Sequence, residues 1–234
     1  MERLDKFLCD CGAGTRSQVK AILKTGRVTV DGKPEKDGSR KIDPEICTVC
    51  LDGAPLGAVG TVVVMLNKPA GYVTATEDKT EKTVMELLPV AMRHLELKPV
   101  GRLDKATEGL LLFTNDGEFA NALMHPKHEV NKVYEVWVKG YDPGASVRLR
   151  RPVELDGYTI RPPQVQVNYA EGDYAKLTVT IHEGRNRQIR RMCDMAGMRV
   201  TRLRRIKEGS LSLGDLKPGK WRYLTDVEVK QLIS

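Results

Sequence analysis

The residues best suited to take part in a chemical reaction lie between Pro99 and Gly117, in the sequence PVGRLDKATEGLLLFTNDG. A polar loop that begins after Gly101 is followed there by an apolar run and by an Asn-Asp-Gly turn. Asp104 therefore stands in a loop that enters a buried strand, where rigid scaffolds commonly present a functional group. A carboxylate in this place can act as a nucleophile or a base, or it can cap a turn, and spacing alone leaves these roles open.

A second feature is the arginine-rich run from Gly184 to Lys207. Nine basic residues face one acidic residue there, Asp194, which is a local excess of +8 against +7 for the whole chain. Arginine rather than lysine dominates, and this suits bidentate phosphate contacts and stacking on bases. The run is either a nucleic-acid-binding surface or a solvated face, and its composition favours nucleic acid.

Helical periodicity is clear between residues 186 and 196 of this run. The buried stripe of that helix consists of Ile189, Met192, Cys193 and Ala196. Arg187 and Arg191 point away from the stripe, whereas Arg190 lies at its edge, about 100° from Ile189. An arginine at the edge can turn inward to a carboxylate, although extension to solvent is the usual outcome.

The bulk composition limits the class of protein. A chain of 234 residues with 41% hydrophobic content can hold one large domain, or a small one beside a medium one, and its positive charge favours an anionic partner. Val62–Leu66 is the longest apolar run and is too short to span a bilayer, and the N-terminus lacks the pattern of a secretory signal. We therefore expect a cytoplasmic protein that does not bind membranes.

The five cysteines suit a reducing compartment and do not predict a metal site. The pairs Cys9/Cys11 and Cys47/Cys50 could be read as zinc ligands. Residues two apart in a helix, or three apart in a strand, point in different directions, so neither pair converges on a regular backbone. Ordinary apolar packing is the simpler interpretation.

The N-terminal part has the pattern of a helix-turn-helix-hairpin unit. Helices are predicted from Leu4 to Cys11 and from Ser17 to Lys24, with Thr15 or Ser17 as the second N-cap. A strand follows at 27–30 and enters a hairpin turn at Asp31-Gly32. The outer face of this unit is basic and would either follow a phosphate backbone or simply be solvated; it carries Arg3, Lys6, Arg16, Lys20, Lys24 and Arg27.

The Gly-, Ala- and Pro-containing segment 52–60 predicts a boundary between domains 1–59 and 60–234. Beyond it, strands are expected at 62–66, 109–114, 132–139, 164–169 and 176–182. Short helices are expected at 84–88, 118–124 and 186–196. Because strands follow one another without long helical crossovers, the predicted class is α+β, with a mixed but mostly antiparallel sheet after the small N-terminal domain.

Four segments together resemble the ribosomal small-subunit pseudouridine synthase A family, which includes related large-subunit enzymes. They are Asn67-Lys68-Pro69-Ala70-Gly71, the loop GRLDKATEGLLLFTNDG, Lys132-Val133-Tyr134-Glu135-Val136, and EGRNRQIRRM followed by Val200-Thr201-Arg202-Leu203. Their order and spacing match as well. The N-terminal unit resembles the alpha-L RNA-binding domain, of the ribosomal-protein S-four type, which precedes the catalytic domain in most of that family.

The resemblance implies roles for particular side chains. Asp104 corresponds to the catalytic aspartate, and Arg190 to its salt-bridge partner. Tyr134 would stack on the target base, and Leu203 would pack beside that base. Further basic residues are expected to contact RNA, namely Arg3, Arg16, Lys20, Lys68, Arg102, Arg187, Arg191, Arg202, Arg204 and Arg205.

The implied activity is isomerisation of a uridine in ribosomal RNA, or in a ribosome-assembly intermediate, by a monomer that uses no cofactor and no metal. An aspartate kept ionised by Arg190 would attack the anomeric carbon of the sugar or remove a neighbouring sugar proton. Asn186-Arg187-Gln188 is closer to the large-subunit branch, so the target subunit is open. The alternatives are a non-catalytic RNA-binding or assembly factor, and a metal-dependent nuclease, which would need clustered carboxylates.

Overall fold

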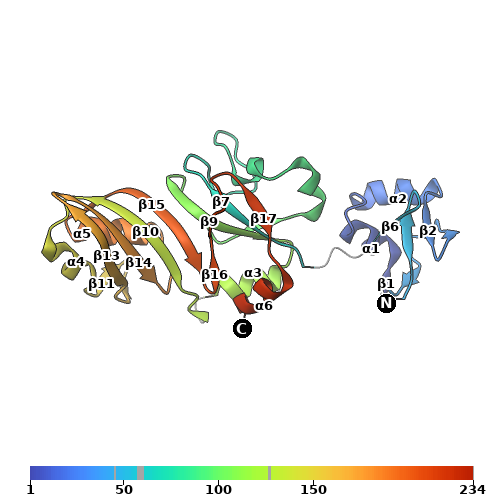
Figure 1. Ribbon diagram of the computed structural model, residues 1–234. Helices are drawn as coiled ribbons and strands as arrows, with labels where there is room; N and C mark the ends of the chain where they lie inside the picture. The colour runs from blue at the N-terminus through green and yellow to red at the C-terminus, as the bar shows by residue number, and fades with distance from the viewer. Residues whose placement is uncertain (45, 57–60, 126–127, 234) are drawn as a thin grey trace. The chain divides into compact units, whose positions relative to one another are not determined.

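The structure is a computed structural model that describes residues 1–44, 46–56, 61–125 and 128–233. The chain divides into two compact units (Figure 1): Met1–Val62 together with Pro89–Leu97, and Val63–Leu88 together with Lys98–Ser234. The expected boundary between residues 59 and 60 falls in 57–60, outside the described residues, so the ranges 1–59 and 60–234 remain predictions. Within the described ranges, no helix has the length and apolarity needed to cross a membrane.

The first unit combines two short helices with short strands. Its elements are β1 (Glu2–Arg3), α1 (Leu4–Asp10), α2 (Arg16–Lys24), β2 (Val28–Val30), β3 (Lys33–Pro34), β4 (Lys41–Ile42), β5 (Val49–Leu51) and β6 (Ala54–Leu56), with the 3-10 helix Val90–Leu95. Thr15 caps α2 by accepting from the Gln18 amide, while the Gln18 side chain accepts from the Thr15 amide. The helices and the hairpin turn at 31–32 are confirmed.

The packing of this unit shows where the cysteines lie and how the first half of the segment 52–60 pairs. Cys11 packs with the buried residues Leu4, Phe7 and Leu8, and Cys9 and Cys47 lie against the same cluster, as expected for apolar packing. The first half of the segment 52–60 continues the fold, because β5 and β6 pair across a turn at Asp52-Gly53.

The second unit is built around one large mixed sheet in the order β13-β14-β10-β15-β9-β7-β17, with β8 paired to β9 and β16 to β15. These strands are β7 (Val63–Lys68), β8 (Lys98–Val100), β9 (Thr107–Thr114), β10 (Lys132–Lys139), β13 (Gln164–Glu171), β14 (Tyr174–Ile181), β15 (Arg199–Glu208), β16 (Leu211–Ser212) and β17 (Trp221–Tyr223). A separate hairpin consists of β11 (Val153–Leu155) and β12 (Tyr158–Ile160). The α+β class with a mostly antiparallel sheet is confirmed.

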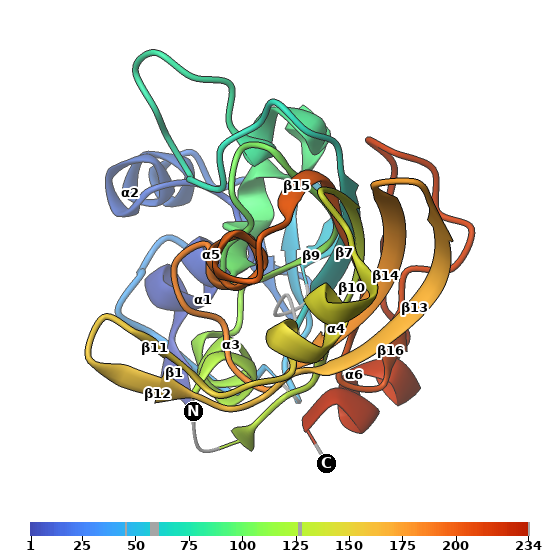
Figure 2. The same cartoon turned by 90° about the vertical axis from the view of Figure 1, so that its left-hand side faces the viewer.

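Helices cover this sheet in two groups. The helices are α3 (Gly117–Met124), α4 (Pro143–Leu149), α5 (Gln188–Met195) and α6 (Asp226–Ile233), and Val84–Leu87 forms a 3-10 helix. α3 and α6 pack with Met65, Leu110 and Leu112 of β7 and β9. α4 and α5 contact each other and lie against β13 and β15, in front of the strands in Figure 2.

The two halves of the sheet meet at a parallel pairing between β9 and β15, which the sequence did not predict. Leu203, Arg204 and Arg205 pair there with Thr107, Glu108 and Gly109, in that order. Every other strand pair of the described sheet is antiparallel. We call this pairing the seam. Gly109 has a φ of +104°, and a Cβ built on it would lie 2.1 Å from the carbonyl oxygen of Arg205, so only glycine fits there.

Replacing Gly109 with alanine is expected to destabilise the protein by about 3 kcal/mol or more, because the methyl group forces the strands of the seam apart and φ stays unfavourable. Urea unfolding measures the loss. The control is Gly117→Ala at the start of α3, where a Cβ meets nothing within 4 Å, and which should be neutral or slightly stabilising. Equal stabilities of the two variants would contradict this account of the seam.

Candidate active site

Asp104 lies in the loop 101–106, between β8 and the start of β9, as the sequence predicted. Its side chain is 35% exposed. Its backbone is firmly held, because the carbonyl oxygen of Asp104 accepts from the amide of Thr107 at 2.9 Å. The loop therefore presents a carboxylate from a backbone that is already ordered.

Lys68, at the end of β7, holds the backbone of this loop in place through hydrogen bonds. Lys68 is completely buried, and its Nζ donates to the carbonyl oxygens of Pro69, Asp104, Lys105 and Thr107 at 3.2, 3.2, 3.3 and 2.8 Å. Burial lowers the pKa of Lys68 to about 8, and the negative charges of Asp104 and Glu108 oppose that shift. The expectation that Lys68 contacts RNA is wrong, because its ammonium is inside the protein.

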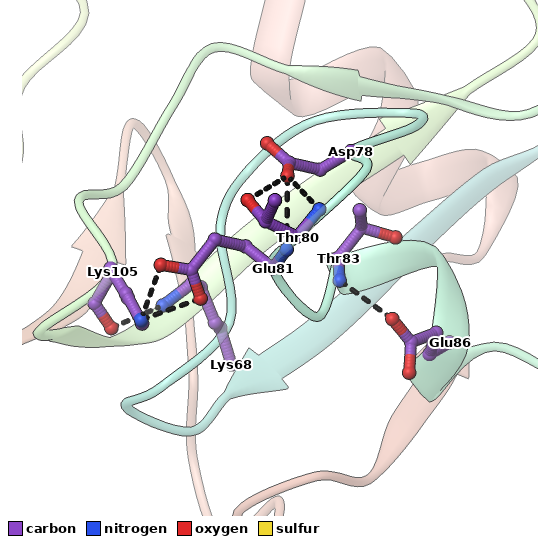
Figure 3. Close-up of polar contacts among 7 residues, drawn as sticks. All are labelled: Lys68, Asp78, Thr80, Glu81, Thr83, Glu86 and Lys105. Carbon is purple, nitrogen blue, oxygen red and sulfur yellow. Dashed lines mark hydrogen bonds and ion pairs between the residues drawn. The ribbon is translucent and has the colours of Figure 1, made fainter.

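The segment 69–83 holds the same loop from a second side. Gly71 donates its amide to the carbonyl oxygen of Lys105 at 2.8 Å. The Thr74 hydroxyl donates to the carbonyl oxygen of Leu103 at 2.7 Å and accepts from its amide. Figure 3 shows Glu81 reaching the ammonium of Lys105, at 2.7 and 2.6 Å, from a turn that the Asp78 carboxylate stabilises. The loop is thus fixed on both sides of Asp104.

Arg187, rather than Arg190, is the arginine within ion-pair distance of Asp104. Its Nη1 lies 4.0 Å from Asp104 Oδ2. Arg187 is the N-cap of α5 and has a φ of +50°. A non-glycine residue adopts this left-handed conformation at an energetic cost, and such costs concentrate at functional sites.

The predicted salt bridge between Asp104 and Arg190 is not among the ion pairs of the described residues, which corrects the sequence interpretation. Arg190 does turn inward. Its guanidinium donates to the carbonyl oxygens of Ala106 and Val200 at 3.2 and 3.4 Å, so it joins the Asp104 loop to β15. Burial lowers the pKa of Arg190, and the charge of Asp104 acts in the opposite direction.

Tyr134 and Leu203 are close to the loop but are almost fully buried, at 7% and 5% exposure. They lie on β10 and β15, where Tyr134 pairs with Arg205. Burial raises the pKa of Tyr134, and the negative charge of Asp104 adds to that rise. Leu203 pairs with Thr107, three residues after Asp104, and Tyr134 lies on the strand next to that of Leu203.

Arg205 belongs to a buried polar cluster beneath Tyr134, and its predicted role in RNA binding is wrong because it is 2% exposed. Its Nε donates to the carbonyl oxygen of Leu110 at 2.7 Å, and its Nη2 lies 3.2 Å from Glu208 Oε2. Lys132 approaches Glu208 at 3.8 Å. Tyr134 pairs with Arg205 across the sheet, so this cluster lies beside the strand position of the phenol.

Buried polar atoms without a hydrogen-bond partner gather around this site. Within the described part of the chain they are Thr107 Oγ1, Arg185 Nε, Gln188 Nε2, Arg190 Nε, Arg205 Nη2 and Glu208 Oε2. All come from the start of β9, the N-terminal end of α5 with the residues before it, or the end of β15. Three of these atoms take part in ion pairs, since Arg205 Nη2 faces Glu208 Oε2 and Arg185 Nε faces Glu183. Buried polar groups are normally satisfied, so the other three, Thr107 Oγ1, Gln188 Nε2 and Arg190 Nε, are the atoms with unused hydrogen-bonding capacity.

The other residues expected to contact RNA differ in whether their charged groups are exposed or are paired with a carboxylate. Arg102, Arg16 and Lys20 are exposed. Arg3 is exposed but contacts Asp5. Three more arginines are paired with carboxylates on distant segments: Arg191 with Asp156, Arg202 with Glu108 and Arg204 with Glu135.

Sequence reasoning missed the supporting residues of the site. Thr74, Glu81 and Glu208 carry no signal in spacing or composition. Lys68, Gly71 and Lys132 stand in segments that carry the resemblance, and that position is the signal that could have drawn attention to them. No group of three or more His, Cys, Asp and Glu residues placed to hold a metal ion is found in the residues that the structure describes.

The burial of Lys68 has a consequence for stability. Its folded pKa of about 8 is below the unfolded value of 10.5. The unfolded chain therefore binds more protons than the folded chain between these values, and the free energy of unfolding rises as pH increases from 8 to 10.5. Relative to Lys68→Met, the wild-type protein should gain roughly 3 kcal/mol over this interval.

Urea unfolding at pH 7, 8, 9 and 10 would measure this gain, because all other titrating groups are shared by the two proteins. Lys105→Met, which removes a lysine at the surface of the same loop, is the matched control. Parallel stability profiles for wild type and Lys68→Met would show that the buried ammonium does not titrate as proposed.

Comparison with known proteins agrees with this geometry. Residues 62–195 match the family model described as RNA pseudouridylate synthase, and residues 2–45 match the S4 domain. A ribosomal small subunit pseudouridine synthase A from Vibrio vulnificus is 38% identical, over 97% of this chain and 97% of that protein. A ribosomal large subunit pseudouridine synthase B from Bacillus subtilis is also 38% identical, over 99% of this chain and 96% of that protein.

A crystal structure of a pseudouridylate synthase has the same fold. The match covers 99% of this chain and 100% of that chain, with 30% identity and a TM-score of 0.67. The family match spans both sides of the Asp104 loop and the start of α5. An S4 domain followed by a synthase domain, with an aspartate presented at the start of a central strand, places this chain in the RNA pseudouridylate synthase family, as an isomerase.

Proposed function

We propose that this protein isomerises a specific uridine of ribosomal RNA to pseudouridine, and that Asp104 is the catalytic carboxylate. The observation that carries the proposal is the fixed loop that presents Asp104 beside Arg187 and above Tyr134. Ribosomal RNA as the substrate class is supported by the names of the relatives from Vibrio vulnificus and Bacillus subtilis. Their equal identity to this chain leaves both ribosomal subunits as candidates for the target.

The chemistry follows from an ionised carboxylate. Arg187 Nη1 lies 4.0 Å from Oδ2 of the Asp104 carboxylate, and the Lys68 ammonium holds the backbone of its loop. This carboxylate either attacks the anomeric carbon of the ribose or removes the proton from the adjacent sugar carbon. Both routes break the carbon-nitrogen glycosidic bond, allow the freed uracil to rotate, and end when a carbon-carbon bond forms and the ring carbon loses its proton.

The target uridine must leave its stack to reach Asp104, at a cost of a few kcal/mol. Tyr134 and Leu203 offer the apolar surface that offsets this cost, and stacking on an aromatic ring contributes about 1 to 3 kcal/mol. The raised pKa of Tyr134 keeps its phenol protonated. This property suits a surface for the base better than it suits a group that must accept the proton from the ring carbon.

The basic surface supplies the affinity for RNA. Arg187, Arg102, Arg16 and Lys20 are exposed and can neutralise phosphates directly. We propose that the protein acts in the cytoplasm as a monomer, in line with the expectation from the sequence.

Asp104→Asn should abolish pseudouridine formation, by about a thousandfold or more, because an amide of the same shape can neither attack carbon nor accept the sugar proton. Affinity for ribosomal RNA should be unchanged, since the loop is held through backbone atoms that this variant keeps. Pseudouridine mapping of ribosomal RNA from complemented deletion cells, together with filter binding, measures both quantities.

Glu118→Gln, which neutralises an exposed carboxylate at the start of α3, is the matched control and should remain active. Retained modification by Asp104→Asn would exclude the proposed role of Asp104. Wild-type cells in which no ribosomal pseudouridine depends on this protein would exclude ribosomal RNA as its substrate.

The salt dependence of RNA binding separates Arg187, whose ion pair with Asp104 is a long one of 4.0 Å, from arginines held in short bidentate pairs. Arg187→Gln should reduce the slope of log K against log salt by about one, as one phosphate contact is lost. Arg202→Gln should reduce the slope less, because Arg202 is already bonded to Glu108 at 3.0 and 2.7 Å. Fluorescence anisotropy over a range of salt concentrations measures the slopes, and equal reductions would contradict this division.

A further inference from the structure

The β11-β12 hairpin is a feature that the proposed chemistry does not use. Its strands form three residue pairs, from Val153–Ile160 to Leu155–Tyr158, around a turn at Asp156 and Gly157. Both turn residues have positive φ, at 56° and 77°, which is typical of a tight two-residue hairpin. A two-stranded hairpin of this size is marginally stable by itself, so its position depends on contacts with other parts of the unit.

Those contacts come from the segment 183–191, which leads into α5. Arg191 binds the carboxylate of Asp156 at 2.7 and 3.0 Å in a bidentate pair. The amide of Arg161 donates to Glu183 Oε1 at 3.3 Å, just beyond the end of β12. Figure 2 shows the hairpin extending beside the chain that enters α5. The tip of the hairpin is thus attached to the part of the chain that carries Arg187.

Tyr158 stands at this tip with one ring face covered by an arginine. The guanidinium carbon of Arg185 is 3.8 Å from the centroid of the Tyr158 ring, a distance at which a cation and an aromatic face attract each other. Tyr158 is nevertheless 57% exposed. The ring is therefore held in place from one side, and much of its remaining surface is open to solvent.

Two arginines of one short segment link this ring to the proposed site of chemistry. Arg185, which holds it, is two residues before Arg187, and two residues span at most about 7 Å. Arg187 in turn approaches Asp104 to 4.0 Å. The segment from Glu183 to Arg191 carries four arginines and one acidic residue. An exposed aromatic ring among arginines has the chemistry of a platform for a base of single-stranded nucleic acid.

We propose that Tyr158 stacks on an RNA base that flanks the target uridine, and that Arg185 and the Asp156–Arg191 pair hold the ring in position. Extrusion of the uridine removes a stacking partner from its neighbours, and Tyr158 replaces that partner. Stacking tolerates any base, so this contact selects for an unpaired neighbour beside the target rather than for a particular sequence. The proposal rests on the proposed function, because it needs a flipped uridine at Asp104.

The test combines variants of the protein with abasic RNA. The substrate is an rRNA hairpin fragment that contains the uridine mapped in the Asp104 experiment, with each flanking nucleotide replaced in turn by an abasic residue. With wild-type protein, one abasic position should lower kcat/KM by about 5- to 100-fold. Tyr158→Ala should lower kcat/KM on the intact fragment by a similar factor, and that abasic position should cause no further loss with this variant.

Three further variants test whether the effect comes from the ring of Tyr158 and from its position. Tyr158→Phe keeps the ring and should behave like wild type. Arg185→Gln removes the guanidinium that packs on the ring. It should lower kcat/KM less than Tyr158→Ala does, and the same abasic position should reduce that loss. Tyr169→Ala removes another exposed tyrosine, 55% exposed at the edge of the sheet, and should show the full abasic penalty. Thermal melting checks that all variants are folded.

Two outcomes would overturn the proposal. The first is an equal penalty for every abasic position with wild type and with Tyr158→Ala. The second is a defect of Tyr158→Ala in cells that is absent on naked RNA, which would assign the ring to a protein partner. Either outcome leaves the role of Asp104 intact if wild type is active and Asp104→Asn is not, so failure of this inference is distinguishable from failure of the proposed function.

Discussion

The proposed active site depends on one buried ammonium group. Lys68 has lost its contact with water, and the carbonyl oxygens of the Asp104 loop replace that water. The interaction fixes the backbone without using the carboxylate of Asp104, which stays available for substrate. The energetic cost of burying the charge is visible in the lowered pKa of Lys68. Such preorganisation means that little rearrangement is needed when the transition state forms.

The arginine-rich run is not a uniform positive surface. Its members divide into a buried residue that supports Tyr134, residues that pair with carboxylates, and exposed residues such as Arg187. The carboxylates come from distant segments, as Glu108, Glu135 and Asp156 do. The local excess of charge that the sequence shows is therefore partly neutralised in the fold, while Arg187, Arg199 and Lys207 stay exposed.

Periodicity predicted the elements whose pattern is regular, such as α3, β10 and the helix of Arg190. It missed β15, because two register shifts against β10 break the alternation of that strand and arginine occupies several of its positions. The helical wheel left the inward turn of Arg190 as one of two options. The partner that the resemblance implied for it, Asp104, was wrong, because its guanidinium donates to the carbonyl oxygens of Ala106 and Val200. Burial of Lys68 and Arg205 was not predictable, since charged residues are rarely buried without partners, and partners are not visible in sequence.

The seam between β9 and β15 affects the order in which the protein folds. Asp104 precedes one strand of this pairing, and Leu203 lies on the other, almost a hundred positions later. Contacts so distant along the chain form slowly and late, because a long loop must close first. A nascent chain emerging from the ribosome thus carries Asp104 long before β15 exists to pair with β9. The proposed site is complete only when β15 docks on β9.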